Sequence, residues 1–509
     1  MSSPAATPDA PLEGGTRILA TFAVSLATFM NILDTTIANV SLPAIAGDFG
    51  VSPSQATWVI TSYGVANAIS VPLTGWLAQR FGQVRLFVIS ILLFILASFC
   101  CGLAQSMPML IFFRVIQGFV AGPMNPLSQT LLLRSYPPSQ AAMAMAAWGT
   151  TVMVGPIMGP PLGGWLTDNW SWPWIFYINI PVGLVAAWMT WSLLAKRESE
   201  KVRVPVDVVG LGLLVVWVAA MQFMLDNGRE LNWFESPEIV TLAVVCGVGF
   251  VFFLVWELYE THPIVDLTLF AKRNFTVGML ANVIGFIPSY ATIVLMPLWL
   301  QQYLGYSATW AGLVTAPMGL VTLVVSPMVA RVMHRFDIRF LVSVSFALYG
   351  LAALGRAGFS TGVAPFDIIA PQLPHGLAIA IFMVSLTTLS FSGLPPERMA
   401  AASGLINFAR IVASSFGTSL STTLWDQRAS FHHARLVDAI TPYRQPAVEA
   451  MQGMSGIGLD PAQSLALMER TVNVQAYTLG VVDIFMLAAL VYLALVFLIW
   501  FAKPEPAAA

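Results

Sequence analysis

Two ionisable residues, Asp34 and Arg114, lie inside long apolar stretches of this sequence. A charged side chain inside a bilayer is costly, and such a residue is a functional candidate by default. A neighbouring guanidinium favours the ionised form of a carboxylate, whereas burial favours its neutral form. A carboxylate balanced between these two effects can take up and release a proton. The alternative is a carboxylate locked in a structural hydrogen bond.

The depths of Asp34 and Arg114 in the membrane can be compared, because an α-helix rises about 1.5 Å per residue. Asp34 lies roughly 24 Å along a helix that starts near Ile18 on the inner side. Arg114 lies roughly 9 Å along a helix that starts near Pro108 on the outer side. Both residues therefore fall in the outer half of a hydrocarbon core about 30 Å thick. The sequence predicts that they meet and couple proton movement, with a purely structural role for Arg114 as the alternative.

Three further residues, Asn407, Arg410 and His375, are candidates for the lining of a central cavity. Arg410 lies roughly 14 Å along its helix from Ala401, near mid-membrane. There it could hold an anionic group, gate the cavity, or form a buried pair with a carbonyl or a carboxylate. A lone histidine or aspartate near a helix end, such as His375 or Asp483, is more often structural.

Catalytic and metal chemistry find little support in the sequence. It has no nucleotide-phosphate loop and no nucleophile with a paired base. The adjacent His432 and His433 would point in different directions on most backbones, and the three cysteines lack the spacing of a metal site. We therefore predict that the protein is not an enzyme and holds no catalytic residue, metal or cofactor, with protons as the coupling ion.

The elements that must position these residues are membrane-spanning helices. Only 9% of the 509 residues are charged and 57% are hydrophobic, whereas a soluble domain has about 25% charged residues. A spanning helix needs about 20 mostly apolar residues. We predict an all-α integral membrane protein with fourteen transmembrane helices. They lie near 18–43, 56–78, 86–104, 108–132, 142–165, 173–194, 207–225, 237–257, 275–300, 309–330, 339–357, 366–390, 401–424 and 478–501.

The distribution of Lys and Arg predicts the orientation of these helices. With the N-terminus in the cytoplasm, the inside segments hold fifteen basic residues and the outside segments six. Because cytoplasmic loops are enriched in Lys and Arg, both termini are predicted to be cytoplasmic. The start of the chain lacks the pattern of a signal peptide, so the first run is expected to be an uncleaved anchor. The polar segment 425–477 is then placed outside the membrane.

An internal repeat divides the chain. A shift of 258 residues places Gly118 on Gly376, Thr130 on Thr388, and Pro137-Pro138 on Pro395-Pro396. Duplicated halves are common in transporters. We predict these parts: a cytoplasmic tail 1–17, a six-helix bundle 18–194, a central linker 195–274 with two extra spans, a six-helix bundle 275–501 that includes 425–477, and a cytoplasmic tail 502–509.

Several long segments resemble the major facilitator superfamily, and within it the fourteen-helix drug:proton antiporters. They read LDTTIANVSLP, WVITSYGVANAISVPLTGWLA, IFFRVIQGFVAGP and FSGLPPERMAAAS, and the likeness runs over nearly the whole chain. The matching positions form four motifs. They are Asp34, Thr36, Asn39 and Pro43 in the helix-1 motif; Arg114, Gln117 and Gly118 in the helix-4 motif; Gly155, Pro156, Gly159, Gly163 and Gly164 in the antiporter motif; and Gly75, Arg80, Gly82 and Arg85 in the cytoplasmic loop motif.

The loop motif departs from the family at Gln79, where the family usually has an acidic residue. A charge-assisted contact from that position would be weaker. A loop that is merely positive on the inner side is the alternative interpretation. The antiporter motif could likewise be only a packing seam, since Gly lets helices approach closely.

The resemblance implies the major facilitator fold, with two six-helix bundles and two inserted central helices. It also implies proton-driven efflux of hydrophobic drug-like compounds across the bacterial inner membrane by alternating access. Pumps of the kind most similar in sequence work with a periplasmic adaptor and an outer-membrane channel, and segment 425–477 is a candidate docking surface. The alternatives are a proton-coupled symporter that imports a nutrient, which the antiporter motif disfavours, and a non-transporting sensor, for which no signalling domain is evident.

Overall fold

The computed structural model describes residues 11–503, except Ser52, Thr57, Arg203, Val204, Val206, His262, Ser307, Ala439 and Pro442. The tails at 1–10 and 504–509, which belong to the predicted cytoplasmic termini, lie outside the described residues. So do the side chains of two motif residues, Pro43 and Pro156. Throughout the described part the regular structure is helical, as the composition predicted.

The first ten α-helices form one bundle. They are α1 (Gly14–Phe49), α2 (Pro53–Ala56), α3 (Trp58–Ser70), α4 (Thr74–Phe81), α5 (Gln83–Gly102), α6 (Met107–Ala121), α7 (Met124–Ser135), α8 (Ala141–Asn169), α9 (Trp174–Tyr177) and α10 (Asn179–Leu194). Its main contacts join α1 to α8 and α10, α3 to α6, and α5 to α6 and α10.

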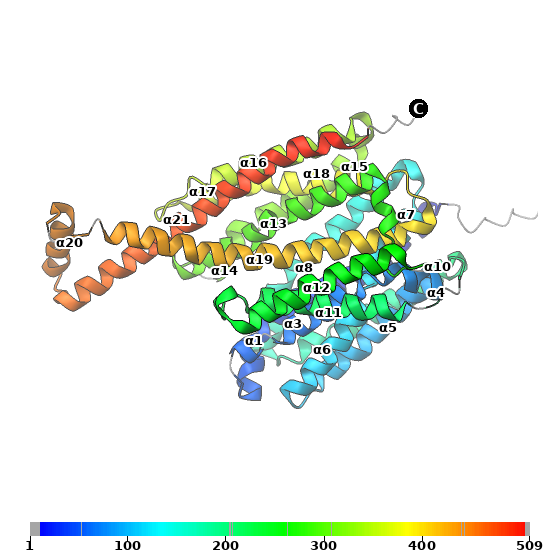
Figure 1. The fold of residues 1–509 in the computed structure, drawn as a ribbon, viewed down its shortest axis with the longest axis horizontal. Coiled ribbons are helices and arrows are strands. Elements are labelled where there is room, and N and C mark those ends of the chain that lie inside the picture. The colour runs from blue at the N-terminus through cyan, green and yellow to red at the C-terminus, as the bar shows by residue number, and fades with distance from the viewer. Residues whose placement is uncertain are drawn as a thin grey trace, which may run out of the picture.

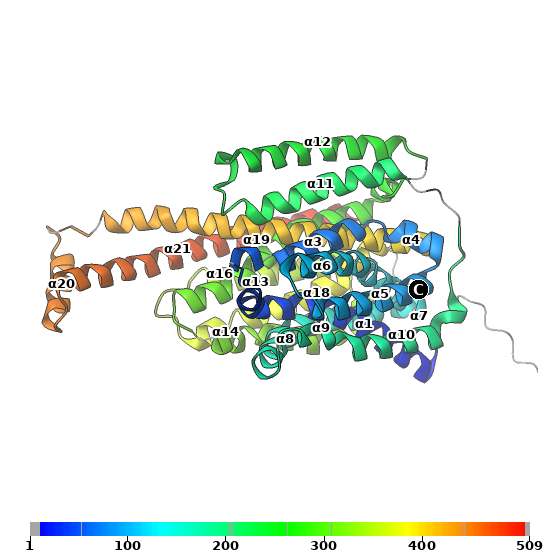
Figure 2. The same ribbon diagram turned by 90° about the horizontal axis from the view of Figure 1, so that it is seen from below.

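The second bundle follows two intervening helices, α11 (Val208–Asn227) and α12 (Pro237–Tyr259). Its helices are α13 (Arg273–Gln302), α14 (Ala308–Thr315), α15 (Pro317–Val332), α16 (Ile338–Arg356), α17 (Pro365–Ile369), α18 (Gln372–Phe391), α19 (Met399–Val437), α20 (Gln445–Gly456) and α21 (Pro461–Leu498). The pair α11–α12 packs together beside α3 and α19, outside the main body, as Figure 2 shows.

Each of the fourteen predicted runs corresponds to one helix or to two consecutive helices. Twelve described segments are long and apolar enough to cross a membrane. The other two predicted runs correspond to the pair α3–α4 and to α8. The structure is thus consistent with fourteen spans. Several spans are broken next to a proline, as between α3 and α4 at Pro72 or between α17 and α18 at Pro371, because proline interrupts the helical hydrogen-bond ladder.

The long helices lie roughly side by side, so the molecule has two ends (Figure 1). We call the end where α1 begins and α21 ends the terminal end, and the opposite end the hairpin end. Helices α19 and α21 extend past the other helices at the hairpin end, with α20 between them (Figure 1). The predicted polar segment 425–477 is therefore mostly helical. We call it the projecting hairpin.

Polar contacts hold the base of the projecting hairpin together. Arg428 Nη2 lies 2.6 Å and His432 Nε2 2.7 Å from the carboxylate of Asp483. His433 instead contacts Glu469 at 3.0 Å. The two adjacent histidines thus point to different partners. Asp483 acts as a structural anchor at the point where α21 leaves the main body.

The apolar core is divided differently at the two ends. At the terminal end a single cluster includes residues of both bundles, among them Met145 and Trp148 of α8 with Phe382 and Met383 of α18. At the hairpin end the first bundle has its own cluster around α1, α6 and α9. The second bundle has a separate cluster around α13, α14 and α21. The two bundles are therefore packed together at the terminal end and have separate cores at the hairpin end.

Candidate functional site

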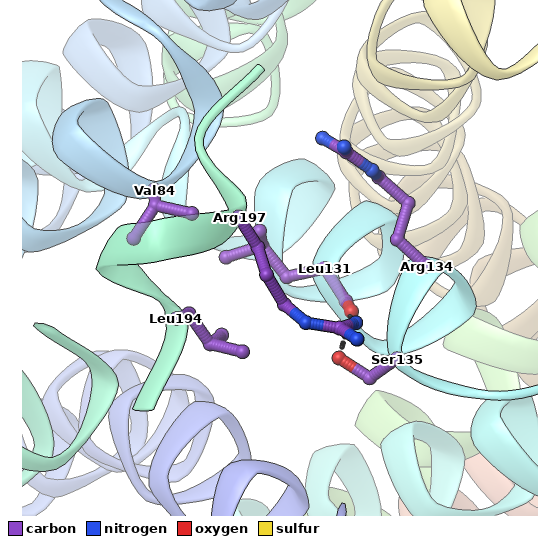
Figure 3. Close-up of a pocket in the computed structure, with 6 residues that line it drawn as sticks. All are labelled: Val84, Leu131, Arg134, Ser135, Leu194 and Arg197. Carbon is purple, nitrogen blue, oxygen red and sulfur yellow. Dashed lines mark hydrogen bonds between the residues drawn. The ribbon is translucent and has the colours of Figure 1, made fainter. Parts of the chain in front are cut away.

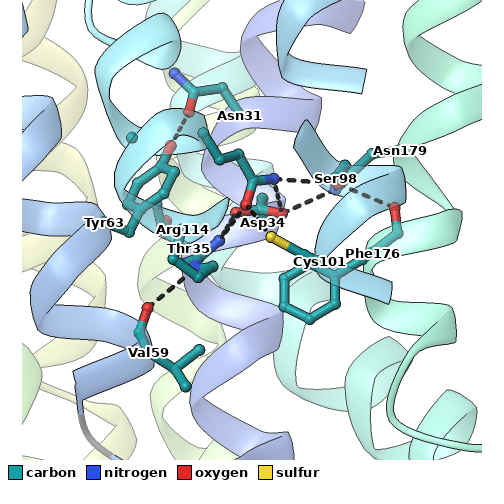
Figure 4. A network of polar contacts seen from close by, with 12 residues as sticks. Asn31, Asp34, Thr35, Val59, Tyr63, Ser98, Cys101, Arg114, Phe176 and Asn179 are labelled. Atoms are coloured by element: carbon teal, nitrogen blue, oxygen red, sulfur yellow. Dashed lines mark hydrogen bonds and ion pairs between the residues drawn. The ribbon is translucent and has the colours of Figure 1, made fainter. Parts of the chain in front are cut away.

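The predicted pair of charged residues is in direct contact in the core of the first bundle. Arg114 Nη1 of α6 lies 2.6 Å from Asp34 Oδ2 of α1, and both side chains are at most 1% exposed. The other carboxylate oxygen, Oδ1, accepts hydrogen bonds from Gln117 Nε2 at 3.0 Å and from Asn179 Nδ2 at 2.8 Å. Figure 4 shows Arg114 and Asn179 directed toward Asp34. Asp34 is thus the acceptor at the centre of a closed network.

The guanidinium of Arg114 makes several further contacts. Its Nε donates to the carbonyl of Val59 at 2.9 Å, and Nη1 donates to Gln117 Oε1 at 2.8 Å. The Tyr63 ring lies 4.2 Å from the guanidinium carbon, in a cation–π contact. Buried charges are tolerated when they are paired and hydrogen-bonded. The arrangement can therefore keep one carboxylate charge deep in the protein.

Protonation of Asp34 would disturb this network. An ionised carboxylate only accepts hydrogen bonds, whereas a protonated one must donate through one oxygen. Both oxygens of Asp34 already face donors. Among the described residues, Oδ2 accepts from a single donor, Arg114 Nη1, so a proton bound there would remove the negative charge that balances the guanidinium. Protonation of Asp34 would therefore leave the buried guanidinium without a counter-ion.

Sequence analysis missed two members of the network, Ser98 of α5 and Asn179 of α10. Ser98 Oγ accepts from Gln117 Nε2 at 3.0 Å and from Asn179 Nδ2 at 2.9 Å. It donates to the carbonyl of Phe176 at 3.1 Å. Both are polar residues inside predicted spans, which is the one sequence feature that could have marked them as candidates. Asn179 lies in an aromatic segment that suggests an interfacial belt instead.

Thr36 and Asn39 of the helix-1 motif lie outside this network. Thr36 Oγ1 donates to backbone carbonyls, including that of Gly155 on α8 at 3.4 Å. Asn39 is exposed. In the helix-4 motif, Gly118 presses against the carbonyl of Tyr63, where no Cβ would fit.

The antiporter motif forms the seam between α8 and α1. A Cβ at Gly155 would come within 2.5 Å of Ile32, and one at Gly163 within 2.6 Å of Ile37. At Gly159 a Cβ would overlap the Thr36 hydroxyl. Three glycines four residues apart thus give α8 a flat face against the helix that carries Asp34. Gly164, which follows, is only partly buried.

The loop motif at the terminal end is completed by a residue that sequence analysis did not single out. The Glu198 carboxylate accepts from the backbone N–H groups of Val84 at 3.0 Å and Arg85 at 2.8 Å. It thereby caps the first turn of α5, where a negative charge is favourable. Gly82 has a φ of 88°, and a Cβ there would collide with Glu198. Glu198 thus supplies a carboxylate at the loop in which Gln79 is neutral.

Other basic residues surround this loop. Arg80 stacks over the Trp76 ring at 5.5 Å, and Gly75 touches Ala401 of the second bundle. Arg134 and Arg197 are among the residues that line a small pocket next to the loop (Figure 3). It is lined by Val84, Leu131, Arg134, Ser135, Leu194 and Arg197, none of which was predicted to form a site.

The three predicted cavity residues fall into two places. Arg410 of α19 donates to Asn282 Oδ1 at 3.0 Å and Thr387 Oγ1 at 3.1 Å, and its guanidinium carbon lies 5.7 Å from the Trp148 ring of the first bundle. Asn407, one turn earlier, donates to Gln129 of the first bundle at 2.9 Å. Both residues therefore lie at the contact between the bundles.

His375 is in a different environment. Its Nδ1 lies 2.9 Å from Arg356 Nη1, and both side chains are fully buried within the second bundle. Arg356 lies at the outer end of the predicted span 339–357, where a basic residue usually reaches water, but here it is the last residue of α16 and is 0% exposed. The apolar residues around it bury it more deeply than its place at the end of a span suggests.

Comparison with known proteins agrees with this architecture. The family model of the Major Facilitator Superfamily matches residues 24–418. The chain is 50% identical to the multidrug export protein EmrB of Haemophilus influenzae and 48% identical to EmrB of Escherichia coli K12, in each case over 97% of both proteins. It is 44% identical to the fatty acid resistance protein FarB of Neisseria gonorrhoeae, again over 97% of both.

Solved structures show the same fold at low sequence identity. The human organic anion transporter MFSD10 has a TM-score of 0.60 and 14% identity, over 96% of this chain and 100% of that one. The proton:xylose symporter XylE has a TM-score of 0.58 and 14% identity, over 96% and 97%. Helices, motifs and relatives together show that the chain belongs to the major facilitator superfamily, a family of membrane transporters and not of enzymes.

Proposed function

We propose that this protein exports hydrophobic drug-like compounds across the bacterial inner membrane in exchange for protons. The observation that carries the proposal is the buried Asp34–Arg114 pair at 2.6 Å, because protonation of its carboxylate would leave a buried guanidinium unpaired and so favour a rearrangement of the network. The names of the EmrB relatives support multidrug export as the direction of transport. Import of a nutrient by symport finds no such support.

The proposed cycle uses the asymmetry between the two ends. We place the terminal end, with both termini, in the cytoplasm, because basic residues are concentrated there. The structure then represents the state that is closed toward the cytoplasm, since the bundles share one core at that end. Protons from the outside would reach Asp34 in this state, and the bundles would rock to release them inward.

Arg410 is proposed to take part in substrate binding. It lies between Trp148 of α8 and Phe286 of α13, with ring centroids at 5.7 and 5.4 Å, and among the described residues its Nη1 finds no hydrogen-bond partner. A cation between aromatic rings can hold the polar part of a hydrophobic molecule while the rings bury the rest. Asn407 belongs to the contact between the bundles, and His375 to a separate cluster.

The experiment for this proposal uses inverted membrane vesicles and a fluorescent hydrophobic dye as the transported probe. An imposed pH gradient, acidic inside, should drive dye into vesicles that contain the protein. Vesicles that lack the protein serve as the control. Uptake that persists at full rate after the gradient is dissipated would contradict proton-driven export.

The closed terminal end is held by a buried polar contact that we expect to control the conformation. Gln129 Oε1 of α7 accepts from Asn407 Nδ2 at 2.9 Å and also from Ser403 Oγ, both on α19. Gln129→Ala removes both bonds, each with a net contribution of about 1 kcal/mol. A loss of about 2 kcal/mol should raise the population of the state open at the terminal end roughly thirtyfold.

Spin labels at the exposed positions Gln79 and Glu397 would report this change as a distance distribution between the bundles. Gln140→Ala is the matched control, because the side-chain bond of Gln140 to Arg17 lies within the first bundle. The Gln129→Ala distribution should gain a long-distance component that the Gln140→Ala variant lacks. Identical distributions in both variants would mean that this contact does not hold the closed state.

We further propose that the protein works with a periplasmic adaptor and an outer-membrane channel, and that the projecting hairpin is the docking surface. Large apolar residues are exposed on it, namely Tyr443 at 96%, Ile457 at 76% and Leu465 at 62%. Apolar groups exposed in an otherwise polar region are typical of a protein interface. The hairpin also extends well past the other helices (Figure 1), as docking at a distance from the membrane requires.

Replacing residues 438–460 with a short Gly/Ser linker tests this surface. The base of the hairpin keeps its Asp483 contacts, so folding should be preserved. We expect the adaptor to be lost on co-purification and export from cells to fall to background, while dye transport in vesicles is unchanged. A variant that still assembles with the adaptor would refute the docking role.

A further inference from the structure

A buried cation without an acidic partner among the described residues lies in the second bundle. Arg356 is 0% exposed, and its described hydrogen bonds go to two neutral side chains. Nη1 lies 2.9 Å from His375 Nδ1, and Nη2 lies 2.9 Å from Gln372 Oε1. No ion pair involving Arg356 is found in the described part of the chain, in contrast to Arg114. The guanidinium charge is therefore not neutralised by these contacts.

The hydrogen-bonding roles in this cluster can be assigned. A guanidinium only donates, so His375 Nδ1 must accept, and its Nε2 then carries the hydrogen. Gln372 likewise accepts through Oε1, so its amide group keeps two N–H donors. Arg356 Nε, Gln372 Nε2 and His375 Nε2 are all buried, and no hydrogen-bond partner is found for them within the described ranges. The cluster therefore presents three unused donor groups and a positive charge.

Burial of such a cluster destabilises the folded protein unless a bound molecule satisfies its donors and balances its charge. An unpaired charge in the protein interior is strongly destabilising, and each buried donor without an acceptor adds to that cost. A water molecule could accept from two donors but would bring no charge. An anion beside Arg356 Nε and Gln372 Nε2 would accept from both groups and neutralise the guanidinium.

By the internal repeat, this cluster occupies the position in the second bundle that matches the surroundings of Asp34 in the first bundle. The shift of 258 residues carries Ser98 onto Arg356, Arg114 onto Gln372, Gln117 onto His375 and Gly118 onto Gly376. Gly376 presses against the carbonyl of Met318 as Gly118 presses against that of Tyr63. The first bundle thus has a carboxylate among its donors, whereas Arg356, Gln372 and His375 at the matching positions bring no negative charge.

We propose that Arg356 and Gln372 form a binding site for a small inorganic anion such as chloride, with His375 Nδ1 holding the guanidinium in place. A small spherical anion suits a fully buried cluster, in which Tyr349 covers the His375 ring at 5.0 Å. Arg356 is the last residue of α16 and lies next to the loop 357–364 at the hairpin end. The anion would reach the site from that side. It supplies the negative charge that Asp34 supplies in the first bundle.

The test measures thermal unfolding of the purified full-length protein in chloride and in gluconate, an anion too large for the site. Chloride should raise the unfolding temperature of the wild type by a few degrees in a saturable manner. Gln372→Glu places a carboxylate where an oxygen already accepts from Arg356. This variant should be as stable in gluconate as the wild type is in chloride, and it should lose the chloride response.

Two further measurements complete the test. Arg410→Gln is the control, because it removes another cation that lacks an acidic partner in the described contacts, and it should keep the chloride response. Crystals grown in bromide should show an anomalous peak beside Arg356, a result that needs no variant. An equal chloride response in Gln372→Glu and the wild type, or no bromide beside Arg356, would overturn the proposal.

Discussion

Replacing Asp34 with asparagine is expected to abolish gradient-driven export while the protein still inserts into the membrane. Asparagine keeps the size of the side chain but cannot hold a proton, so no coupling ion can be exchanged at this position. It also leaves Arg114 without its counter-ion in a site that is 1% exposed. Loss of one partner of a buried ion pair costs about 3–5 kcal/mol. Dye uptake and the unfolding temperature of the purified variant should therefore both fall.

A double variant separates these two effects. Asp34→Asn with Arg114→Gln removes both charges, so no unpaired ion remains and much of the stability should return. Export should stay at background, because the proton carrier is still missing. Asp48→Asn is the control for loss of one acidic charge from the same helix, since Asp48 is exposed and bonds to Trp172. Gradient-dependent export by the double variant would show that Asp34 has only a structural role.

The second large effect is expected at Gly159 in the seam between α8 and α1. Gly159→Val places a branched side chain where even a Cβ would overlap the Thr36 hydroxyl. The helix that carries Asp34 would have to move, at a cost of about 1–3 kcal/mol for overpacking. We expect export to fall to background, measured as gradient-driven dye uptake at equal amounts of membrane protein.

Two further variants make this prediction specific. Gly212→Val is the matched control, because Gly212 on α11 is exposed and a Cβ added there would meet no described atom within 4 Å. Thr36→Ala removes the hydroxyl, which is the nearest of the atoms that the new side chain meets, so it should partly restore export when combined with Gly159→Val. If Gly159→Val exports as well as Gly212→Val does, close packing of this seam is not required for transport.

Much of the fold followed from the sequence because each span is a long apolar run between polar segments. The contact between Asp34 and Arg114 could also be anticipated, since helix rise alone gives the depth of each residue. Their partners Ser98 and Asn179 could not be placed. Depth says nothing about which face of a helix is turned toward which neighbour, and a single serine in a span is common.

Other parts depended on long-range packing that no local pattern contains. The Glu198 cap joins residues more than one hundred positions apart, Glu198 and Val84. Arg356 lies at the end of a span, where a charged side chain usually reaches water. Packing in the folded protein nevertheless buries it completely. The helices of the projecting hairpin were not predicted, because the sequence analysis recognised helices only by long apolar runs and this segment is polar. The closed terminal end depends on contacts such as Gln129 with Asn407, which exist only once both bundles are folded.

The most direct measurement is proton release from the purified protein when substrate is added in weakly buffered detergent solution. A pH-sensitive dye would follow the release, with the hydrophobic dye of the vesicle experiments as the substrate. We predict that the wild type releases protons on substrate addition and that Asp34→Asn releases none. Equal proton release from the two proteins would contradict the central claim that Asp34 carries the coupling proton.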